Sequence, residues 1–173
     1  MPIEKDTKNW TWVIDKPCPD CGFDATNYPN SAISGAIRDN ASAWAPVLQR
    51  PDVRVRPNDS TWSALEYAAH VRDVLAVYTT RLQLMLDEDD PQFPNWDQDE
   101  TAIAERYNEQ DPETVGSQLT SNAAGLADSF DALTQAQSSR PGRRSDGAGF
   151  TVSSLAKYMT HDLVHHRWDV GAH

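Results

Sequence analysis

Apolar residues recur every three or four positions in four long segments, which is the spacing of amphipathic helices. No run of alternating apolar and polar residues is long enough to predict a strand. The apolar positions, in chain order, are Ile33, Ala36, Ile37, Ala41, Trp44 and Leu48; Leu65, Ala68, Ala69, Val71, Leu75, Tyr78, Leu82 and Met85; Val115, Leu119, Ala123, Leu126, Phe130 and Leu133; Val152, Leu155, Ala156, Met159, Leu163 and Trp168. This pattern predicts a protein built from four long helices.

Residues with short polar side chains precede each of the four segments and are suited to cap the first turn of a helix. The candidate N-caps are Ser31 for the first helix, Ser60 or Thr61 for the second, Asp111 for the third, and Thr151 or Ser153 for the fourth. Pro112 fits the first turn of the third helix, where its missing N–H costs nothing. The connection 89–111 is long and contains a predicted short helix around Glu100–Tyr107.

These elements predict an all-α four-helix bundle. Because the 89–111 connection is long enough to span the bundle, the third helix can run parallel to the second, which gives a crossed, up-down-down-up topology. At 173 residues the chain has the size of one domain. We therefore expect a single domain over 1–173, with an irregular N-terminal segment (1–30) and a bundle (31–170).

The acidic composition excludes two classes of partner. Fifteen Lys and Arg residues against 26 Asp and Glu give a net charge of −11, which repels nucleic acid and anionic membranes. The chain shows neither a secretory signal nor an apolar run of membrane-spanning length, so we expect a cytoplasmic protein. An exposed helical face could support a homodimer.

Histidines supply the candidate chemistry. His161 and His165 are four residues apart on the last helix, about 40° around its axis, so they share a face and could hold one ion. His166 lies about 140° from His161 and is expected to point elsewhere. His70 on the second helix is the candidate third ligand. Three neutral nitrogens would leave coordination positions open for catalysis, whereas isolated histidines of this kind are ordinarily polar residues at the edge of a core.

Other polar residues could support such a site. Asp73 and Asp169 are placed to accept hydrogen bonds from His70 and His165, although both also fit ordinary helix-surface charge. The pair Cys18 and Cys21 is compatible with a structural turn, a reversible disulfide, or a metal role near the histidines. The basic cluster of Arg140, Arg143 and Arg144 could meet a carboxylate or lie in a solvated loop, and Trp96 lies in the long connection.

Two stretches resemble a known family. WSALEYAAHVRDV is similar to the second-helix motif of the DinB-like (YfiT-like) superfamily, and TVSSLAKYMTHDLVHHRWDV resembles its last-helix motif. The resemblance extends from about Ser31 to Val170 and implies a crossed four-helix bundle that binds a divalent metal through His70, His161 and His165. CPDCGFDA, WDQDETA and NEQDP resemble the actinobacterial branch related to mycothiol-dependent maleylpyruvate isomerase and mycothiol S-transferases.

The resemblance implies a thiol-dependent S-transferase or isomerase, whose partners are a low-molecular-weight thiol and a small electrophile. The metal would ionise the thiol, and zinc is favoured because this needs no redox change, with nickel, manganese and iron left open. A metal-dependent hydrolase is the alternative; Asp97, Asp99 or Glu66 could then serve as general base. A non-catalytic bundle with a structural metal is the third hypothesis.

Overall fold

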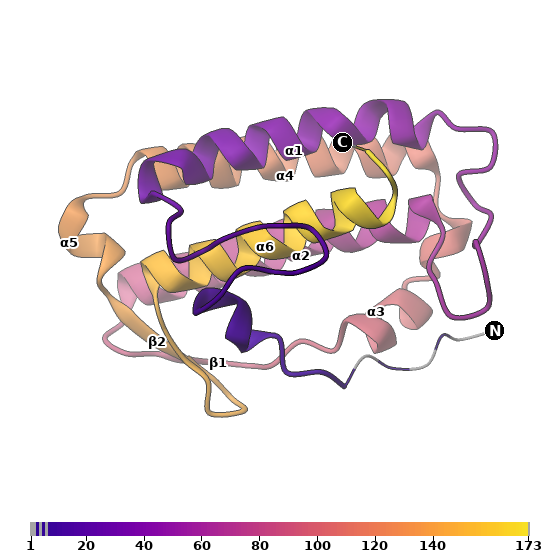
Figure 1. The fold of residues 1–173 in the computed structure, drawn as a ribbon. Helices are drawn as coiled ribbons and strands as arrows, with labels where there is room; N and C mark the ends of the chain where they lie inside the picture. Colours follow the sequence, from indigo (N-terminus) through magenta and orange to yellow (C-terminus); the bar gives the residue numbers. More distant parts are fainter. Residues whose placement is uncertain (1–2, 4, 6, 173) are drawn as a thin grey trace.

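The structure is a computed structural model that describes residues 3, 5 and 7–172, and four long helices dominate it (Figure 1). Short elements lie before and between them. The long helices are α1 (Ile33–Leu48), α2 (Ala64–Asp87), α4 (Pro112–Asp131) and α6 (Val152–Asp169). The short elements are the 3₁₀ turns η1 (Thr11–Ile14), η2 (Asn30–Ala32) and η3 (Tyr107–Glu109) and the helices α3 (Gln98–Ala104) and α5 (Gln135–Ser138).

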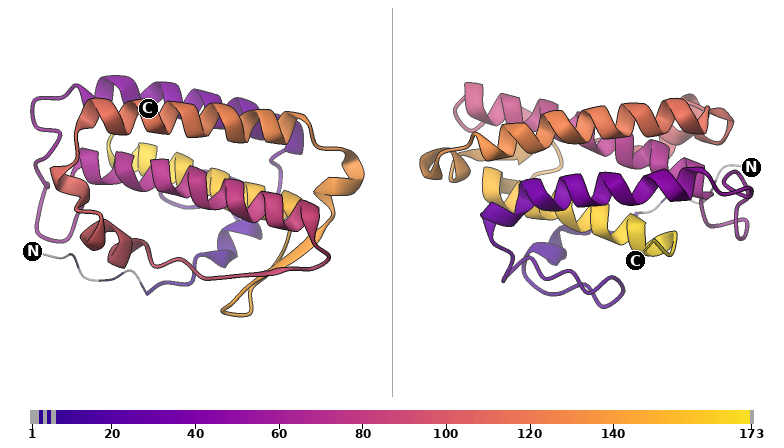
Figure 2. Two further views of the ribbon diagram at one scale, coloured as in Figure 1. Left: turned by 180° about the vertical axis from the view of Figure 1, so that it is seen from behind. Right: turned by 90° about the horizontal axis from the view of Figure 1, so that it is seen from above.

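The helices form the crossed bundle that the sequence predicts. α1 and α6 run in one direction, and α2 and α4 run in the other (Figures 1 and 2). α1 packs against α4 and α6, and α2 packs against the same two helices. The connection from α2 to α4 travels the length of the bundle, which is why these consecutive long helices are parallel. The N-terminal segment runs along the outside of α6, where η1 packs.

Capping explains where three of the four long helices begin. The exception is α1, whose N-cap is Ala32 without a side-chain hydrogen bond, so the prediction of Ser31 as its cap was wrong. Asp111 accepts a hydrogen bond from the backbone N–H of Thr114 (2.8 Å), and Thr151 caps α6, as the sequence predicts. The prediction for α2 was wrong: its N-cap is Ser63, not Ser60 or Thr61. Ser63 has Glu66 three residues later, and the two form a reciprocal capping box. Ser60 and Thr61 have no Glu or Gln three residues later and cannot form one.

A small sheet in the connections was not predicted. β1 (Gln92–Phe93) pairs in parallel with β2 (Pro141–Arg144), which pairs antiparallel with β3 (Gly149–Thr151). Strands of this length contain too few residues to show the alternation that identifies a strand in sequence. The sheet ties the connection after α2 to the hairpin before α6.

The apolar stripes of the four helices meet in one core. Its largest fully buried apolar side chains, by helix, are Trp44, Ile33 and Ile37 of α1, Leu65, Leu75 and Met85 of α2, Leu119 and Leu126 of α4, and Met159 and Leu163 of α6. His70 of α2 is fully buried as well, although it is polar. Within the described residues, no helix has the length and apolar character needed to cross a membrane.

Candidate metal centre

Helix α6 carries two pairs of potential metal ligands, each spaced four residues apart. Asp162 and His166 form one pair, and His161 and His165 form the other. Because successive residues are about 100° apart on a helix, the two pairs lie on adjacent faces. The structure gives each pair a different partner: Asp162 and His166 meet His70 of α2, whereas His161 and His165 meet the cysteines of the N-terminal segment.

The first group places three ligand atoms within 4.8 Å of one another. Nε2 of His70 lies 3.4 Å from one carboxylate oxygen of Asp162, and Nε2 of His166 lies 3.2 Å from the other. The His70 and His166 rings meet edge to face, with centroids 4.7 Å apart. Two imidazoles and one carboxylate converging in this way are the ligand set of an open, catalytic metal site.

Unsatisfied nitrogens show that this group fits a metal. Both ring nitrogens of His70 and Nε2 of His166 are buried, and none has a hydrogen-bond partner among the described residues. The approaches to Asp162 are short enough for ion pairs but lack hydrogen-bond geometry. Leaving buried polar atoms unpaired is costly, and a bound cation would satisfy the lone pairs that face Asp162.

Neighbouring side chains hold the two rings in place. Nδ1 of His166 lies 2.8 Å from a carboxylate oxygen of Asp169, which leaves Nε2 facing Asp162. A carboxylate behind a ligand histidine orients the ring and raises its basicity. Trp96 stacks on His70, with centroids 5.4 Å apart and planes 1° from parallel. The ring of Trp62 lies 5.3 Å from His70, so two indoles flank this imidazole.

Burial and charge set the protonation of the group. Burial lowers the pKa of His70, which leaves a neutral imidazole. Burial also lowers the pKa of His166, but the carboxylates of Asp162 and Asp169 outweigh it and raise that pKa to about 9. Burial raises the pKa of Asp162, yet the charge on His166 holds it well below its usual value. A cation binding at Nε2 of His166 therefore has to displace a proton.

The second group consists of Cys18, Cys21, His161 and His165, whose ligand atoms also lie within 4.8 Å of one another. Sγ of Cys18 lies 3.7 Å from Nδ1 of His165. Both cysteines are free. Burial lowers the pKa of His161 to about 4, lowers that of His165, and raises that of Cys21 to about 11. Trp10 packs beside both imidazoles, with centroids 5.8 and 5.4 Å away.

The predicted ligands His70, His161 and His165 do not lie together in one group. The structure divides these residues between the two groups, and His166, which was expected to point elsewhere, is the histidine beside His70. The rotation argument was correct in separating His166 from His161. That argument measured angles from His161, however. Which residues meet α2 depends instead on which side of α6 faces the core.

A signal for this choice is present in the sequence. The buried apolar positions Val152, Ala156, Met159 and Leu163 follow a four-three-four spacing. Continuing that spacing by three reaches His166, which places it on the core stripe of α6. Asp162 lies one turn earlier on the same side. Extending the apolar stripe would have identified this pair, whereas the more conspicuous HxxxH pattern points to the flank of the helix.

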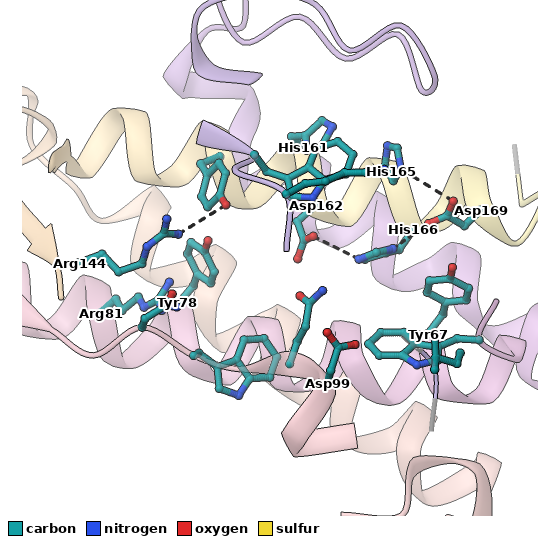
Figure 3. Close-up of a pocket in the computed structure, with 18 of the residues that line it drawn as sticks. Tyr67, Tyr78, Arg81, Asp99, Arg144, His161, Asp162, His165, His166 and Asp169 are labelled. Atoms are coloured by element: carbon teal, nitrogen blue, oxygen red, sulfur yellow. Dashed lines mark hydrogen bonds and ion pairs between the residues drawn. The ribbon is translucent and has the colours of Figure 1, made fainter. Parts of the chain in front are cut away.

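A cavity of about 370 Å³ adjoins the first group. Figure 3 shows His166, Asp169 and Tyr67 toward one side of this pocket, Arg81, Arg144 and Tyr78 toward the other, and Asp162 between them. Trp96, Asp99 and Tyr158 also line it, and Trp10, His161 and His165 contribute from the side of the N-terminal segment. The pocket therefore combines a potential metal centre with a cationic region.

Arg81 is a buried cation that sequence reasoning missed. It is 6% exposed, and no carboxylate of the described residues lies within 4.0 Å of its guanidinium. Nη2 donates to the backbone carbonyl of Pro94 (3.2 Å), and the guanidinium lies over the rings of Tyr78 and Phe93. Burial lowers its pKa. The sequence signal was an arginine three residues after Tyr78, beside the apolar stripe of α2.

The basic cluster of the hairpin divides in the structure. Arg144 lines the pocket, where its Nη1 lies 3.5 Å from the hydroxyl of Tyr158 and its Nη2 pairs with Asp146. Arg140 donates to the backbone carbonyl of Met85 at 2.6 Å, which joins the hairpin to the end of α2. Arg143 pairs with Asp90 at the surface. Only Arg144 of these three faces the cavity.

The carboxylates that the sequence suggested as supports or general bases have different partners in the structure. Asp73 receives hydrogen bonds from Arg72 and from the hydroxyl of Tyr107. Glu66 completes the α2 capping box and pairs with Arg56.

Asp97 caps α3 and pairs with Lys5 (2.7 Å). These partners give Asp73, Glu66 and Asp97 structural roles. Asp169 supports His166 more directly than His165, whose Nε2 lies 3.8 Å away, and Asp99 lines the cavity.

Comparison with known proteins agrees with this architecture. The structure is similar to that of YfiT from Bacillus subtilis, described as a probable metal-dependent hydrolase with an unusual four-helix bundle topology. The likeness has a TM-score of 0.75 and 16% sequence identity and covers 83% of this chain and 85% of that one. No curated protein sequence matches the chain. The model of the DinB superfamily matches residues 36–170, which is more than half of the sequence, and the chain belongs to this superfamily.

Proposed function

We propose that the protein is a metal-dependent enzyme in which His70, Asp162 and His166 bind one divalent ion at the wall of the cavity. The observation that carries this proposal is the convergence of three potential ligands, in which both ring nitrogens of His70 and Nε2 of His166 are buried and have no hydrogen-bond partner among the described residues. A divalent ion held by two imidazoles and one carboxylate would keep open positions and lower the pKa of a thiol or water bound there.

The surrounding residues have distinct tasks in this scheme. Asp169 orients His166 through Nδ1, and Trp96 and Trp62 flank His70, so the ligand nitrogens are positioned before a cation arrives. The neutral imidazole of His70 is ready to bind. Asp162 is the group toward which both histidines turn, and its negative charge would offset part of the charge of the ion.

The cationic side of the pocket indicates the class of substrate. Arg81 is buried, with no carboxylate partner in the part of the chain that the structure describes, and Arg144 lies with it at the cavity wall. A buried cation is expensive unless it is paired, so a carboxylate or phosphate on the substrate would be bound strongly here. We therefore propose a small anionic electrophile whose acidic group meets these arginines while its reactive carbon faces the metal centre.

The nucleophile in this proposal is a low-molecular-weight thiol. None of the described residues that line the cavity is a cysteine, so the thiol would come from a cosubstrate. In transfer, the thiol loses its proton to solvent, a carbon–sulfur bond forms, and the leaving group departs with the electron pair of the broken bond. The resemblance of CPDCGFDA, WDQDETA and NEQDP to mycothiol-dependent enzymes supports mycothiol as the first thiol to test.

Metal-dependent hydrolysis is the second candidate, and the position of Asp99 favours it. This carboxylate lines the same cavity and could serve as the general base that hydrolysis needs. The probable hydrolase activity described for YfiT makes this alternative worth testing beside thiol transfer.

The decisive experiment is a parallel assay of one preparation. Apoprotein is loaded separately with zinc, manganese, nickel or iron(II), and thiol consumption with a chlorinated carboxylic acid is compared with ester hydrolysis. Thiol conjugation that requires metal and is lost in His70→Ala supports transfer, whereas ester cleavage without thiol dependence supports hydrolysis. Unfolding on chelation with neither activity would indicate a structural metal and overturn the proposal.

A further inference from the structure

The geometry points to a second metal site, in which Cys18, Cys21, His161 and His165 bind one zinc ion and fasten the N-terminal segment to α6. Two thiolates and two imidazoles make a closed, four-ligand site of the structural zinc type. This site is distinct from the group at His70, and the inference does not depend on the proposed enzymatic function.

The ligand atoms are close enough to bind one ion after a small movement toward it. Tetrahedral zinc with sulfur and nitrogen ligands brings its ligand atoms to about 3.3–3.8 Å from one another. Sγ of Cys18 and Nδ1 of His165 are 3.7 Å apart, and all four ligand atoms lie within 4.8 Å. Four side chains from two segments more than a hundred residues apart in sequence thus converge on one point.

The turn around the cysteines presents both sulfurs together. The backbone N–H of Gly22 donates to the carbonyl of Cys18 (3.0 Å), and the N–H of Cys18 donates to the carbonyl of Phe23 (2.9 Å). Gly22 has a φ of +74°, a left-handed conformation that suits glycine. These bonds close the loop over Cys18-Pro19-Asp20-Cys21, so the two thiols reach the same side without further rearrangement.

The histidines provide an independent observation. Nε2 of His161 is buried and has no hydrogen-bond partner among the described residues, and His161 is 4% exposed. Nε2 of His165 lies 3.8 Å from Asp169, on the other side of the ring from the Nδ1 that faces Cys18. A ligand histidine commonly has its second nitrogen turned to such an acceptor. The unsatisfied nitrogen of His161 has no comparable acceptor among the residues that the structure describes.

This site would shape the cavity from outside. Trp10, eight residues before Cys18, packs on His161 and His165 and also lines the pocket. Fastening the cysteines to α6 therefore holds one wall of the cavity in place. The chain from η1 to the cysteine turn lies along α6 in Figure 1, as such a fastening requires.

The test uses the full chain and a cobalt probe, with reduced wild-type protein, Cys18→Ser/Cys21→Ser and His70→Ala/His166→Ala as matched double variants. Cobalt(II) bound by thiolates gives an intense near-ultraviolet charge-transfer band, whereas cobalt bound by imidazole and carboxylate does not. We expect the band in wild type and in His70→Ala/His166→Ala, and its loss in Cys18→Ser/Cys21→Ser. Absence of the band from reduced wild type would overturn the inference, and this measurement needs no variant to fold.

Zinc content separates this inference from the proposed function. Wild type should hold about two equivalents, and each double variant about one. About one equivalent in wild type that is lost only with the cysteines would support the Cys2His2 site and contradict the metal centre at His70. About one equivalent that is lost only with His70 and His166 would support the metal centre and overturn the Cys2His2 site. A Cys18–Cys21 disulfide as the stable form of the purified, zinc-exposed protein would also overturn it.

Discussion

The carboxylate of Asp162 on α6 lies 3.4 Å from Nε2 of His70 on α2, with no hydrogen bond between them. A fully buried imidazole beside a carboxylate would ordinarily satisfy its polar atoms by pairing. Here the two groups, together with His166, lie around a common point at the edge of the cavity. This relationship is the basis of the proposed metal centre and of the first prediction.

Replacing Asp169 with asparagine should weaken zinc binding at the His70 centre about 10- to 100-fold, because a carboxylate that contacts the second nitrogen of a ligand histidine orients its ring. The measurement is competition with a chromophoric chelator in the Cys18→Ser/Cys21→Ser background, so that only one site is read. Asp128→Asn is the matched control, since Asp128 pairs with Arg38 on the exposed surface. An unchanged dissociation constant in Asp169→Asn would show that Asp169 does not position His166.

Replacing Arg81 with glutamine should raise KM for an anionic substrate roughly 30-fold, which corresponds to the loss of about 2 kcal/mol from a charge-assisted contact. The KM of a neutral analogue should change little, because the lost interaction is with the acidic group. Steady-state kinetics on both substrates checks this. Arg143→Gln is the control, as Arg143 is exposed and pairs with Asp90. Equal effects on charged and neutral substrates would argue against an anion contact.

The Glu66–Arg56 pair should make stability depend on acid pH. Burial raises the pKa of Glu66, but Arg56 and the Ser63 backbone outweigh it, and the net pKa is lowered. A carboxylate whose folded pKa is depressed contributes stability above its unfolded pKa of about 4.3, and this is lost as pH falls through the folded value. Glu66→Gln should lower the free energy of unfolding by about 2 kcal/mol at neutral pH, and less below pH of about 4.

Urea unfolding of wild type and Glu66→Gln across pH 3–7, a range of about four units around that pKa, measures the difference. Glutamine keeps the capping-box geometry, so the comparison isolates the charge. Asp111→Asn, at another N-cap without an arginine pair, serves as the comparison. A Glu66→Gln difference that stays constant throughout this range would exclude the ion pair as its cause.

Gly142 of the hairpin packs closely against Met85 of α2. A Cβ at this position would lie 2.8 Å from Cγ of Met85, so Gly142→Ala has to displace a fully buried side chain. Overpacking of this kind costs about 1–3 kcal/mol. In β3, Gly149→Ala meets nothing within 4 Å and should cost less. Thermal unfolding of the two variants checks the difference, and equal melting temperatures would contradict it.

Much of the fold was readable along the chain. The apolar stripes predict four helices, Asp111 and Thr151 mark two helix starts, and the length of the 89–111 connection predicts the parallel arrangement of α2 and α4. These features depend on the spacing of apolar residues and on the length of a connection, and both can be read directly from the sequence. The Ser63 cap and the short sheet were missed because each depends on a specific partner or on very few residues.

The candidate site, like the fold, could be predicted only in part from the sequence. The sequence by itself indicated that His161 and His165 share a face of α6 as potential ligands and that His70 lies on another helix. Only the tertiary structure decided that Asp162 and His166 meet His70 while His161 and His165 meet Cys18 and Cys21. Spacing along one helix sets which residues share a face, but the rotation of that helix against its neighbours, set by core packing, determines what each face meets.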